Sequence, residues 1–477
     1  MAAESRTVRC EADGELWKGR PRIMAGQRRV KGQGGGEIHG LSDSGLGENG
    51  ASDNAYECEW STGGRLVSLW DRQLRAVARP ATWSHAAGVA GKEIGMTASQ
   101  SQTAEKALFQ ERWDRIQAAM DAARIDALIV ASRGVIGQFG NVFYLCGYTP
   151  LLRVSYGVLT RSGEPVLFVP SYVDQALALD RGIVTEIRTS AEMDVMRSDV
   201  SMAQAVASEI KARDATRVGI VGLAQIVPIA DHAILRQELR GIELLDASGL
   251  YARVKEIKTS ADITHVKAAF ALAQRAYDAA PGLLAPGTRA QDVVAEVESV
   301  LRRATGSEAL VFVDSAPLWV RRNTDTVFAA GDLVMVLVEV ATAAGYFVEQ
   351  GGLFSVGEPR SHARIVADAC YSALAAIGTE IRPGAAVAAA TEIHETIGGN
   401  AGLELRLALG HGVGVDHDLP TLYRTDTGMF KEGQLISVHP YYWDDATSVF
   451  GGVSDAFYVT ADGSQRMGSH DYELTIV

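Results

Sequence analysis

The chain has 477 residues, 47% of them hydrophobic and 22% charged, which is ordinary globular composition and enough length for two or three domains. A formal net charge of −13 argues against a general nucleic-acid-binding protein, because phosphate contacts need a basic surface. No apolar run is long enough to cross a bilayer, no signal peptide opens the chain and the four cysteines share no metal-ligand spacing, so we expect a cytoplasmic protein without a membrane partner.

Residues 1–95 differ in pattern from the rest of the chain. They include the glycine-rich stretches GQGGGEIHG and GLGENGASD, and they follow neither the helical nor the strand period. This pattern predicts either an unstructured extension or a start assigned too far upstream, with Met96 as the alternative start. The segment holds four of the chain's seven tryptophans, which is unusual for a disordered tail.

Residues 104–250 alternate between helical and strand patterns, which is typical of an α/β domain. A helix is expected first, because ALFQERWDRIQAAMDAARI repeats apolar residues at helical spacing. DALIVAS and NVFYLCGY are interpreted as strands, and YGVLTRSGEPVLFVPS as a β-hairpin around a Ser-Gly turn. Further strands are expected at DATRVGIVGL and IELLDAS, with a helix from Ala230 to Leu239 between them.

Residues 255–477 combine long helices with strands. Thr259 or Ser260 is a good N-cap for an amphipathic helix over Ile263–Ala279, and Thr288 with Gln291 has the spacing of a capping box. A strand-rich stretch, GDLVMVLVEVATAAGYFVEQGGLF, comes next, followed by two helical patterns and a series of strands with glycine turns. We therefore predict an α+β domain.

Five motifs in this second part resemble those of the aminopeptidase P, prolidase and creatinase family, M24, in the family's order. They are YARVKEIKTSADITHVKAA, APGTRAQDVVAEVE, the GDLVMVLVE…GYFVEQGGLFSVG hairpin, GHGVGVDHDLP and FKEGQLISVHP. GGVSDAFYVTADG is similar to the family's closing strand. The resemblance implies a creatinase-like N-terminal α/β domain followed by a pita-bread catalytic domain, and it covers about residues 105–470.

The metal ligands of the family's peptidases are only partly present here. Those enzymes hold two metal ions with two aspartates, one histidine and two glutamates. The first aspartate falls on Leu337 or Val338, the first glutamate on His439 and the last glutamate on Ser454. Only the histidine, His411, and a carboxylate at the second aspartate, Glu349, remain. The family's two-metal site is therefore not expected.

The candidate site residues follow from this alignment. We predict His411, His439, Glu349 and His417 as catalytic residues, and Glu339, Asp418, Trp319 and Arg321 as substrate-binding residues. Glu339 lies two residues beyond Leu337, so on a strand it faces the same side and can stand in for the lost aspartate. Each of these residues also has a structural interpretation: a loop or core histidine, a polar turn, or a surface position.

Two mechanisms stay open for such a site. His411, His439 and Glu349 can form a two-histidine, one-carboxylate site for one iron, zinc or manganese ion. Without metal, the two histidines can act as acid and base with Glu349 orienting one of them, as the resemblance to creatinase implies.

The function that we predict is hydrolysis of an amide-type or amidine-type C–N bond in a small molecule. The alternatives are a lyase, an Xaa-Pro-type metallopeptidase with a rearranged site, and a catalytically inactive family member that binds a ligand. The expected partners are a small-molecule substrate and, by resemblance, a second copy of the chain in a homodimer.

Overall fold

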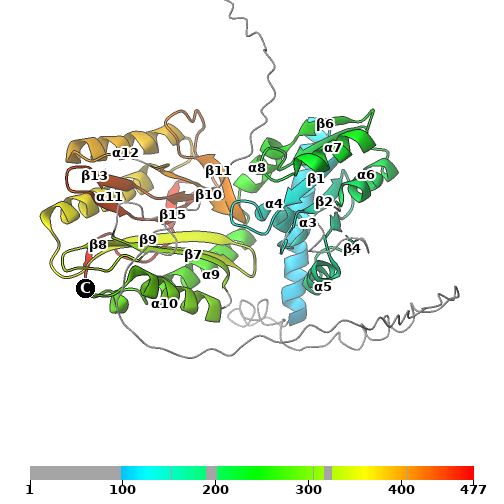
Figure 1. Cartoon of the computed structure of the whole chain (residues 1–477). Helices are drawn as coiled ribbons and strands as arrows, with labels where there is room; N and C mark the ends of the chain where they lie inside the picture. The colour runs from blue at the N-terminus through cyan, green and yellow to red at the C-terminus, as the bar shows by residue number, and fades with distance from the viewer. Residues whose placement is uncertain (1–97, 152, 190–200, 305, 316–324, 406) are drawn as a thin grey trace, which may run out of the picture. The chain divides into compact units, whose positions relative to one another are not determined.

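The structure is a computed structural model that describes residues 98–151, 153–189, 201–304, 306–315, 325–405 and 407–477 (Figure 1). The segment 1–95, for which we expected no fold, lies outside the described residues. So do Trp319 and Arg321, two of the candidate substrate-binding residues. Their predicted roles therefore stay predictions.

The N-terminal α/β part is built around one mixed sheet. Its elements are α3 (Ala98–Ala123), β1 (Ala127–Ser132), α4 (Gly140–Cys146), β2 (Ser155–Thr160), β3 (Val166–Phe168), α5 (Tyr172–Arg181), β4 (Glu186–Arg188), α6 (Ala203–Ala212), β5 (Arg217–Val221), α7 (Ile229–Glu238) and β6 (Glu243–Asp246). The strand order is β4-β3-β2-β1-β5-β6. Strand β1 is buried along its whole length, as its apolar run predicts, and the β2–β3 hairpin forms as expected.

One element of this part contradicts the sequence-based expectation. NVFYLCGY was expected to be a strand, but Gly140–Cys146 is the helix α4. A short apolar run does not distinguish a buried strand from a buried helix by periodicity. Gly147 ends the helix in the left-handed conformation, at φ 68°, and its N–H donates to the Phe143 carbonyl.

The C-terminal part follows the short helix α8 (Ser248–Glu256). Its elements are α9 (Ser260–Tyr277), η1 (Pro281–Leu283), α10 (Ala290–Arg303), β7 (Gly306–Asp314), β8 (Leu333–Thr342), β9 (Phe347–Ser355), α11 (Ser361–Glu380), α12 (Val387–Ala401), β10 (Gly410–Gly414), β11 (Asp416–Thr421), β12 (Leu435–Val438), β13 (Tyr441–Asp444), β14 (Val449–Gly452), β15 (Asp455–Thr460), β16 (Gly463–Arg466) and β17 (Thr475–Ile476).

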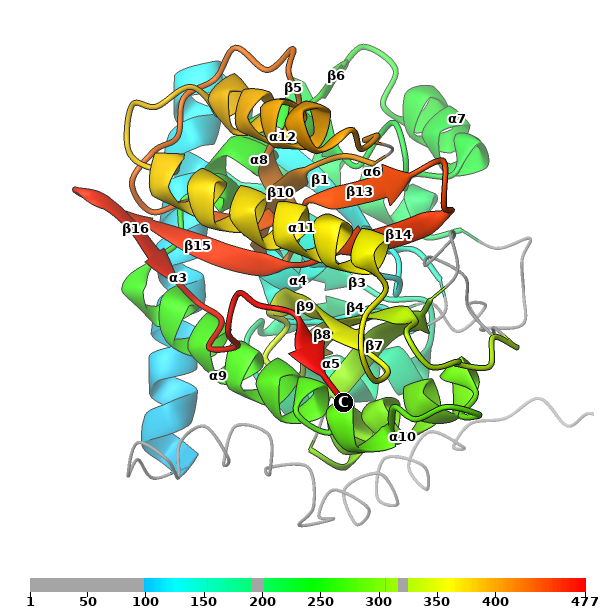
Figure 2. The same cartoon turned by 90° about the vertical axis from the view of Figure 1, so that its left-hand side faces the viewer.

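These strands form sheets that are covered by the long helices. One sheet has the order β17-β9-β8-β7, another has the order β11-β10-β12-β15-β16, and β13 pairs with β14. Helices α9 and α10 pack on β7, β8 and β9, whereas α11 packs on β13, β14 and β16 (Figure 2). Together with the N-terminal sheet, this is the α/β plus pita-bread architecture that the motifs predict.

Helix starts were predicted with mixed success. Thr259 caps α9, because its side chain accepts from the Asp262 N–H while the Asp262 carboxylate accepts from the Thr259 N–H. The capping box expected at Thr288 is wrong, since α10 has Arg289 at its N-cap and no side-chain cap.

Arg112, on α3, joins the N-terminal part to the C-terminal part through a buried ion pair. Its guanidinium lies 2.9 Å from Asp262 Oδ1 and 2.7 Å from the Tyr346 hydroxyl oxygen. Burial would raise the pKa of Asp262, but Arg112 and its hydrogen bonds lower it to about 2. Tyr346 directly precedes β9 and lies three residues before Glu349. Its hydrogen bonds to Arg112 and Asp262 therefore also fix the start of β9.

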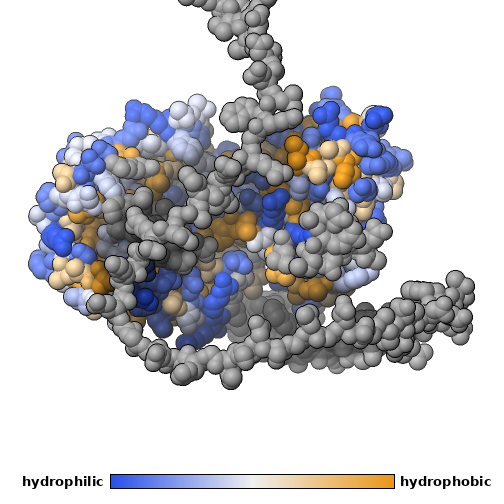
Figure 3. Space-filling model, in the orientation of Figure 1, coloured by the Kyte–Doolittle hydropathy of each residue, from blue (hydrophilic) through white to orange (hydrophobic). Residues whose placement is uncertain are grey.

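Helix α5 carries several exposed apolar side chains. Tyr172, Val173, Leu177 and Leu179 of this helix are exposed, and Figure 3 shows apolar side chains in this area. No helix in the described part of the chain is long and apolar enough to span a membrane.

Replacing Arg112 with methionine should destabilise the protein strongly. Asp262 would be left charged and buried, which costs about 3–5 kcal/mol of unfolding free energy. The matched control is Lys106→Met, which breaks the exposed pair with Glu164 and should cost less than about 1 kcal/mol. Denaturant unfolding of both variants measures the difference, and equal small losses would show that Arg112 does not hold the two parts together.

Candidate active site

Strands β8 and β9 place two carboxylates side by side. Glu339 and Glu349 are direct cross-strand partners, so their side chains leave the sheet on the same face. Leu337 and Gly351 are the next pair on that face, and a Cβ on Gly351 would fall 2.9 Å from Leu337 Cδ1. Leu337 therefore fills the place beside Gly351 with apolar bulk.

Strands β10 and β12 carry the histidines. His411 pairs with Ser437, and His439 follows directly after β12, where its N–H donates to the Leu409 carbonyl at 2.7 Å. Pro440 has no N–H and ends the ladder there. The Ser437 hydroxyl donates to Glu349 Oε2 at 3.0 Å.

The structure brings Glu349 of β9, His411 of β10 and His439, which follows β12, into one cluster. Their ligand atoms all lie within 4.8 Å of one another. His411 Nε2 is 3.2 Å from Glu349 Oε1, and His439 Nε2 is 3.8 Å from Glu349 Oε2. The convergence is the one expected from the motifs, while the catalytic roles of the three residues stay predictions.

His417 lies at the edge of this cluster. Its Nε2 is 3.7 Å from Glu349 Oε1, and its ring centroid is 4.2 Å from that of His411. The side chain of His417 is 44% exposed, against 19% for His411 and 11% for His439. His417 is therefore the histidine of the cluster that is most open to solvent.

The charges of the cluster are set by burial and by the pairing of Glu349 with His411. Burial would lower the pKa of His411, but the carboxylate of Glu349 raises it to about 9. Burial would raise the pKa of Glu349, but His411, His417 and His439 hold that pKa well below its usual range. The resulting pair is an imidazolium facing a carboxylate.

His439 and the neighbouring Glu339 are uncharged near neutral pH. Burial lowers the pKa of His439 to about 4, so its imidazole is neutral, and its Nδ1 has no hydrogen-bond partner among the described residues. Burial and the nearby Glu349 raise the pKa of Glu339 well above its usual range, so its carboxyl stays protonated. A protonated carboxyl can donate a hydrogen bond.

Among the described residues, Glu349, His411 and His439 form one group whose ligand atoms could hold a metal ion. His411 Nδ1 donates to the Gly412 carbonyl at 2.9 Å. Its Nε2, which faces Glu349, would bind a cation in place of the proton that it carries in the metal-free protein. Leu337 offers no ligand atom. Ser454, at the position of the last glutamate, has a buried hydroxyl with no hydrogen-bond partner in the described part of the chain.

The acidic residue next to Ser454 does not supply the missing ligand. Asp455 lies 2.6 Å from Arg466 Nε, and it accepts hydrogen bonds from the Tyr472 hydroxyl and the Gly468 N–H. Both carboxylate oxygens of Asp455 therefore already accept hydrogen bonds from other parts of the domain.

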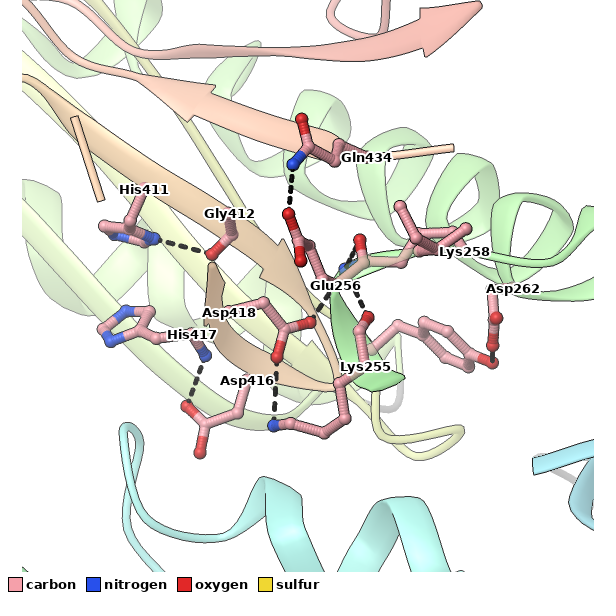
Figure 4. Close-up of polar contacts among 12 residues, drawn as sticks. Lys255, Glu256, Lys258, Asp262, His411, Gly412, Asp416, His417, Asp418 and Gln434 are labelled. Carbon is pink, nitrogen blue, oxygen red and sulfur yellow. Dashed lines mark hydrogen bonds and ion pairs between the residues drawn. The ribbon is translucent and has the colours of Figure 1, made fainter. Parts of the chain in front are cut away.

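Asp418, a candidate substrate-binding residue, lies outside the cluster. Asp418 follows His417 on β11, so the two side chains leave the strand on opposite faces. The Asp418 carboxylate is buried 3.0 Å from Lys255 Nζ and 2.8 Å from Lys258 Nζ (Figure 4). His411 and His417 point to the other side of the hairpin in the same view. The two lysines lower the pKa of Asp418 and hold its charge in the fold.

Two residues near the site were not identified from the sequence. Ser437 hydrogen-bonds Glu349, but a serine within an apolar strand gives no distinguishing signal. Asp416, at the turn between β10 and β11, has a positive φ of 93°. The sequence feature that could have identified Asp416 is its position in a glycine-rich turn, where aspartate is a preferred residue.

The titration of His411 tests the electrostatics of this cluster. In metal-free protein we expect its imidazole to lose its proton near pH 9, because the carboxylate of Glu349 favours the charged form. Since the unfolded pKa is about 6.5, this proton stabilises the fold fully below pH 6.5 and the contribution is lost as the pH rises through 9. Histidine NMR measures the titration directly.

The control for this titration is Glu349→Gln. Without the carboxylate, burial should dominate and His411 should titrate at or below pH 6.5. Titration of His411 near 6.5 in the unmodified protein would contradict the ion pair.

Comparisons with known proteins agree with this architecture. Residues 264–461 match the model of metallopeptidase family M24, and residues 112–257 match the creatinase/prolidase N-terminal domain. The chain is 24% identical to an uncharacterized hydrolase/peptidase of Sinorhizobium fredii, over 79% of this chain and 98% of that protein. It is 23% identical to an Xaa-Pro dipeptidase of Pyrococcus horikoshii, over 77% of this chain and 99% of that one.

Solved structures show the same fold. The dipeptidase PepE from Mycobacterium ulcerans superposes with a TM-score of 0.65 at 20% identity, and the superposition covers 78% of this chain and 98% of that one. The motifs, the fold and both family matches point the same way: the chain belongs to metallopeptidase family M24, with a creatinase/prolidase domain preceding its M24 domain.

Proposed function

We propose that this chain hydrolyses an amide-type C–N bond in a small substrate, at a centre that holds a single divalent cation. The observation that supports it best is the cluster of Glu349, His411 and His439, whose ligand atoms lie within 4.8 Å of one another. Two imidazoles and one carboxylate suit zinc, iron or manganese and leave positions for water and substrate. The relatives named as peptidases also cleave C–N bonds, which supports the same reaction class.

The surrounding residues are suited to binding and proton transfer. A bound cation would supply a Lewis acid for the carbonyl oxygen and would lower the pKa of a bound water. His417 can hold or accept a proton at Nε2, because its side chain is near Glu349 and open to solvent. The protonated Glu339 can donate to a carbonyl oxygen or a leaving nitrogen, and Ser437 keeps Glu349 oriented.

A metal-free mechanism is the second candidate, and one observation favours it. Glu349 is already paired with His411 at 3.2 Å and accepts a hydrogen bond from Ser437, so the cluster is electrostatically satisfied by its own residues. In that case His411 would be the proton donor and the neutral His439 the acceptor.

Metal binding separates these two candidates. Full-length protein equilibrated with zinc or manganese should bind one ion per chain by elemental analysis and calorimetry. Glu349→Gln, His411→Ala and His439→Ala should each weaken binding by more than about 100-fold, and Ser437→Ala by about 10- to 100-fold as an outer partner. His362→Ala removes an exposed histidine elsewhere and is the matched control. Two ions per chain would exclude the proposed centre, and turnover without metal would favour the second candidate.

Product analysis separates hydrolysis from elimination. The protein should be incubated in ¹⁸O-labelled water with Xaa-Pro dipeptides, other dipeptides, small amides and amidines. Hydrolysis transfers one labelled oxygen to the acyl or amidine carbon and releases the amine. An unsaturated product without label would identify a lyase, and saturable binding without turnover would identify an inactive binding protein.

A further inference from the structure

The turn between β10 and β11 contains a backbone conformation that needs an explanation. Asp416 is a non-glycine residue at φ 93°, a region that side chains adopt at a cost, and it is only 4% exposed. The next residue is His417. A strained residue directly before a histidine of the cluster can serve to fix where that histidine points.

The carboxylate of Asp416 binds a segment of the N-terminal domain. Oδ1 accepts from the Gly137 N–H at 2.6 Å and Oδ2 accepts from the Gly140 N–H at 3.0 Å. Oδ1 also accepts from the N–H of His417 at 2.9 Å. One buried carboxylate therefore ties residues 137 and 140 to the backbone of His417.

The glycines of this segment are needed for the contact. A Cβ on Gly140 would fall 2.0 Å from the Val415 carbonyl oxygen and 2.4 Å from Asp416 Cβ, so only glycine lets the turn approach this closely. A Cβ on Gly137 would lie 3.8 Å from His417 Nδ1. Residues 133–140, here called the 133–140 segment, therefore approach the ring of His417 at Gly137.

We propose that Asp416 is a positioning residue that latches the 133–140 segment to the β10–β11 turn, so that this segment forms one wall of the substrate site beside His417. The inference rests on the proposed function in one respect, which is that His417 borders the substrate. It assigns part of the substrate specificity to the N-terminal domain, through a segment that also presents Val135 with 53% exposure.

Hydrogen exchange tests the latch without a substrate. In Asp416→Ala we expect the amides of residues 133–140 to exchange about 10-fold faster or more, because charge-assisted hydrogen bonds are lost. Asp416→Asn keeps one acceptor oxygen and should give a smaller increase. Asp214→Ala changes another aspartate with positive φ, on the exposed surface, and is the matched control. Unchanged exchange in Asp416→Ala would overturn the latch.

Chemical modification tests the positioning of His417. In both Asp416 variants, the rate at which diethyl pyrocarbonate modifies His417 should change at least about threefold, as the ring leaves its contact with Glu349 and Phe347. The exposed His362 in the same molecules should react at an unchanged rate. Gly140→Ala, which pushes the turn away from α4, should reproduce both effects with Asp416 intact.

Hydrogen exchange and chemical modification test the role of Asp416 independently of the proposed hydrolase function. Faster exchange with unchanged reactivity of His417 would show that Asp416 only joins the two domains, and would overturn its positioning role. For any substrate found, a latch variant should raise KM more than it lowers kcat, because a wall of the site binds substrate. Failure to find a substrate leaves the exchange and modification results decisive for the latch.

Discussion

The carboxylate of Glu349 is the group on which the rest of the site depends. It is buried between sheets, and a buried carboxylate is costly unless it is paired. His411, His417 and His439 face it, and the hydroxyl of Ser437 donates to it. The same carboxylate raises the pKa of His411, and it adds to the effect of burial in raising the pKa of Glu339.

The fold keeps the family's frame, while three of the five positions that hold metal ligands in the family's peptidases carry a different residue here. Leu337 closes the place of one aspartate with an apolar side chain, and Ser454 leaves only a buried hydroxyl at the place of a glutamate. The histidine at 439 adds a neutral ligand where a charged one is expected. This loss of negative charge is the physical reason for proposing a single cation, since carboxylate-rich sites are what hold pairs of hard divalent ions.

Much of this could be predicted from the sequence, because strand periodicity and motif order are local properties. The alternation of strands places Glu339 on the face of Glu349, and the motifs place His411 and His439 at the same centre. The pairing of Asp418 with Lys258 could not be predicted, because the two residues are 160 positions apart in the chain and nothing local links them. The helix α4 was also missed, since a short apolar run fits a strand or a helix equally well.

Anomalous diffraction at the absorption edge of the bound metal, from crystals of the full chain grown with zinc or manganese, tests the central claim most directly. We expect one peak per chain, enclosed by the side chains of Glu349, His411 and His439. Two peaks about 3.5–4 Å apart, or one peak away from these three side chains, would contradict it.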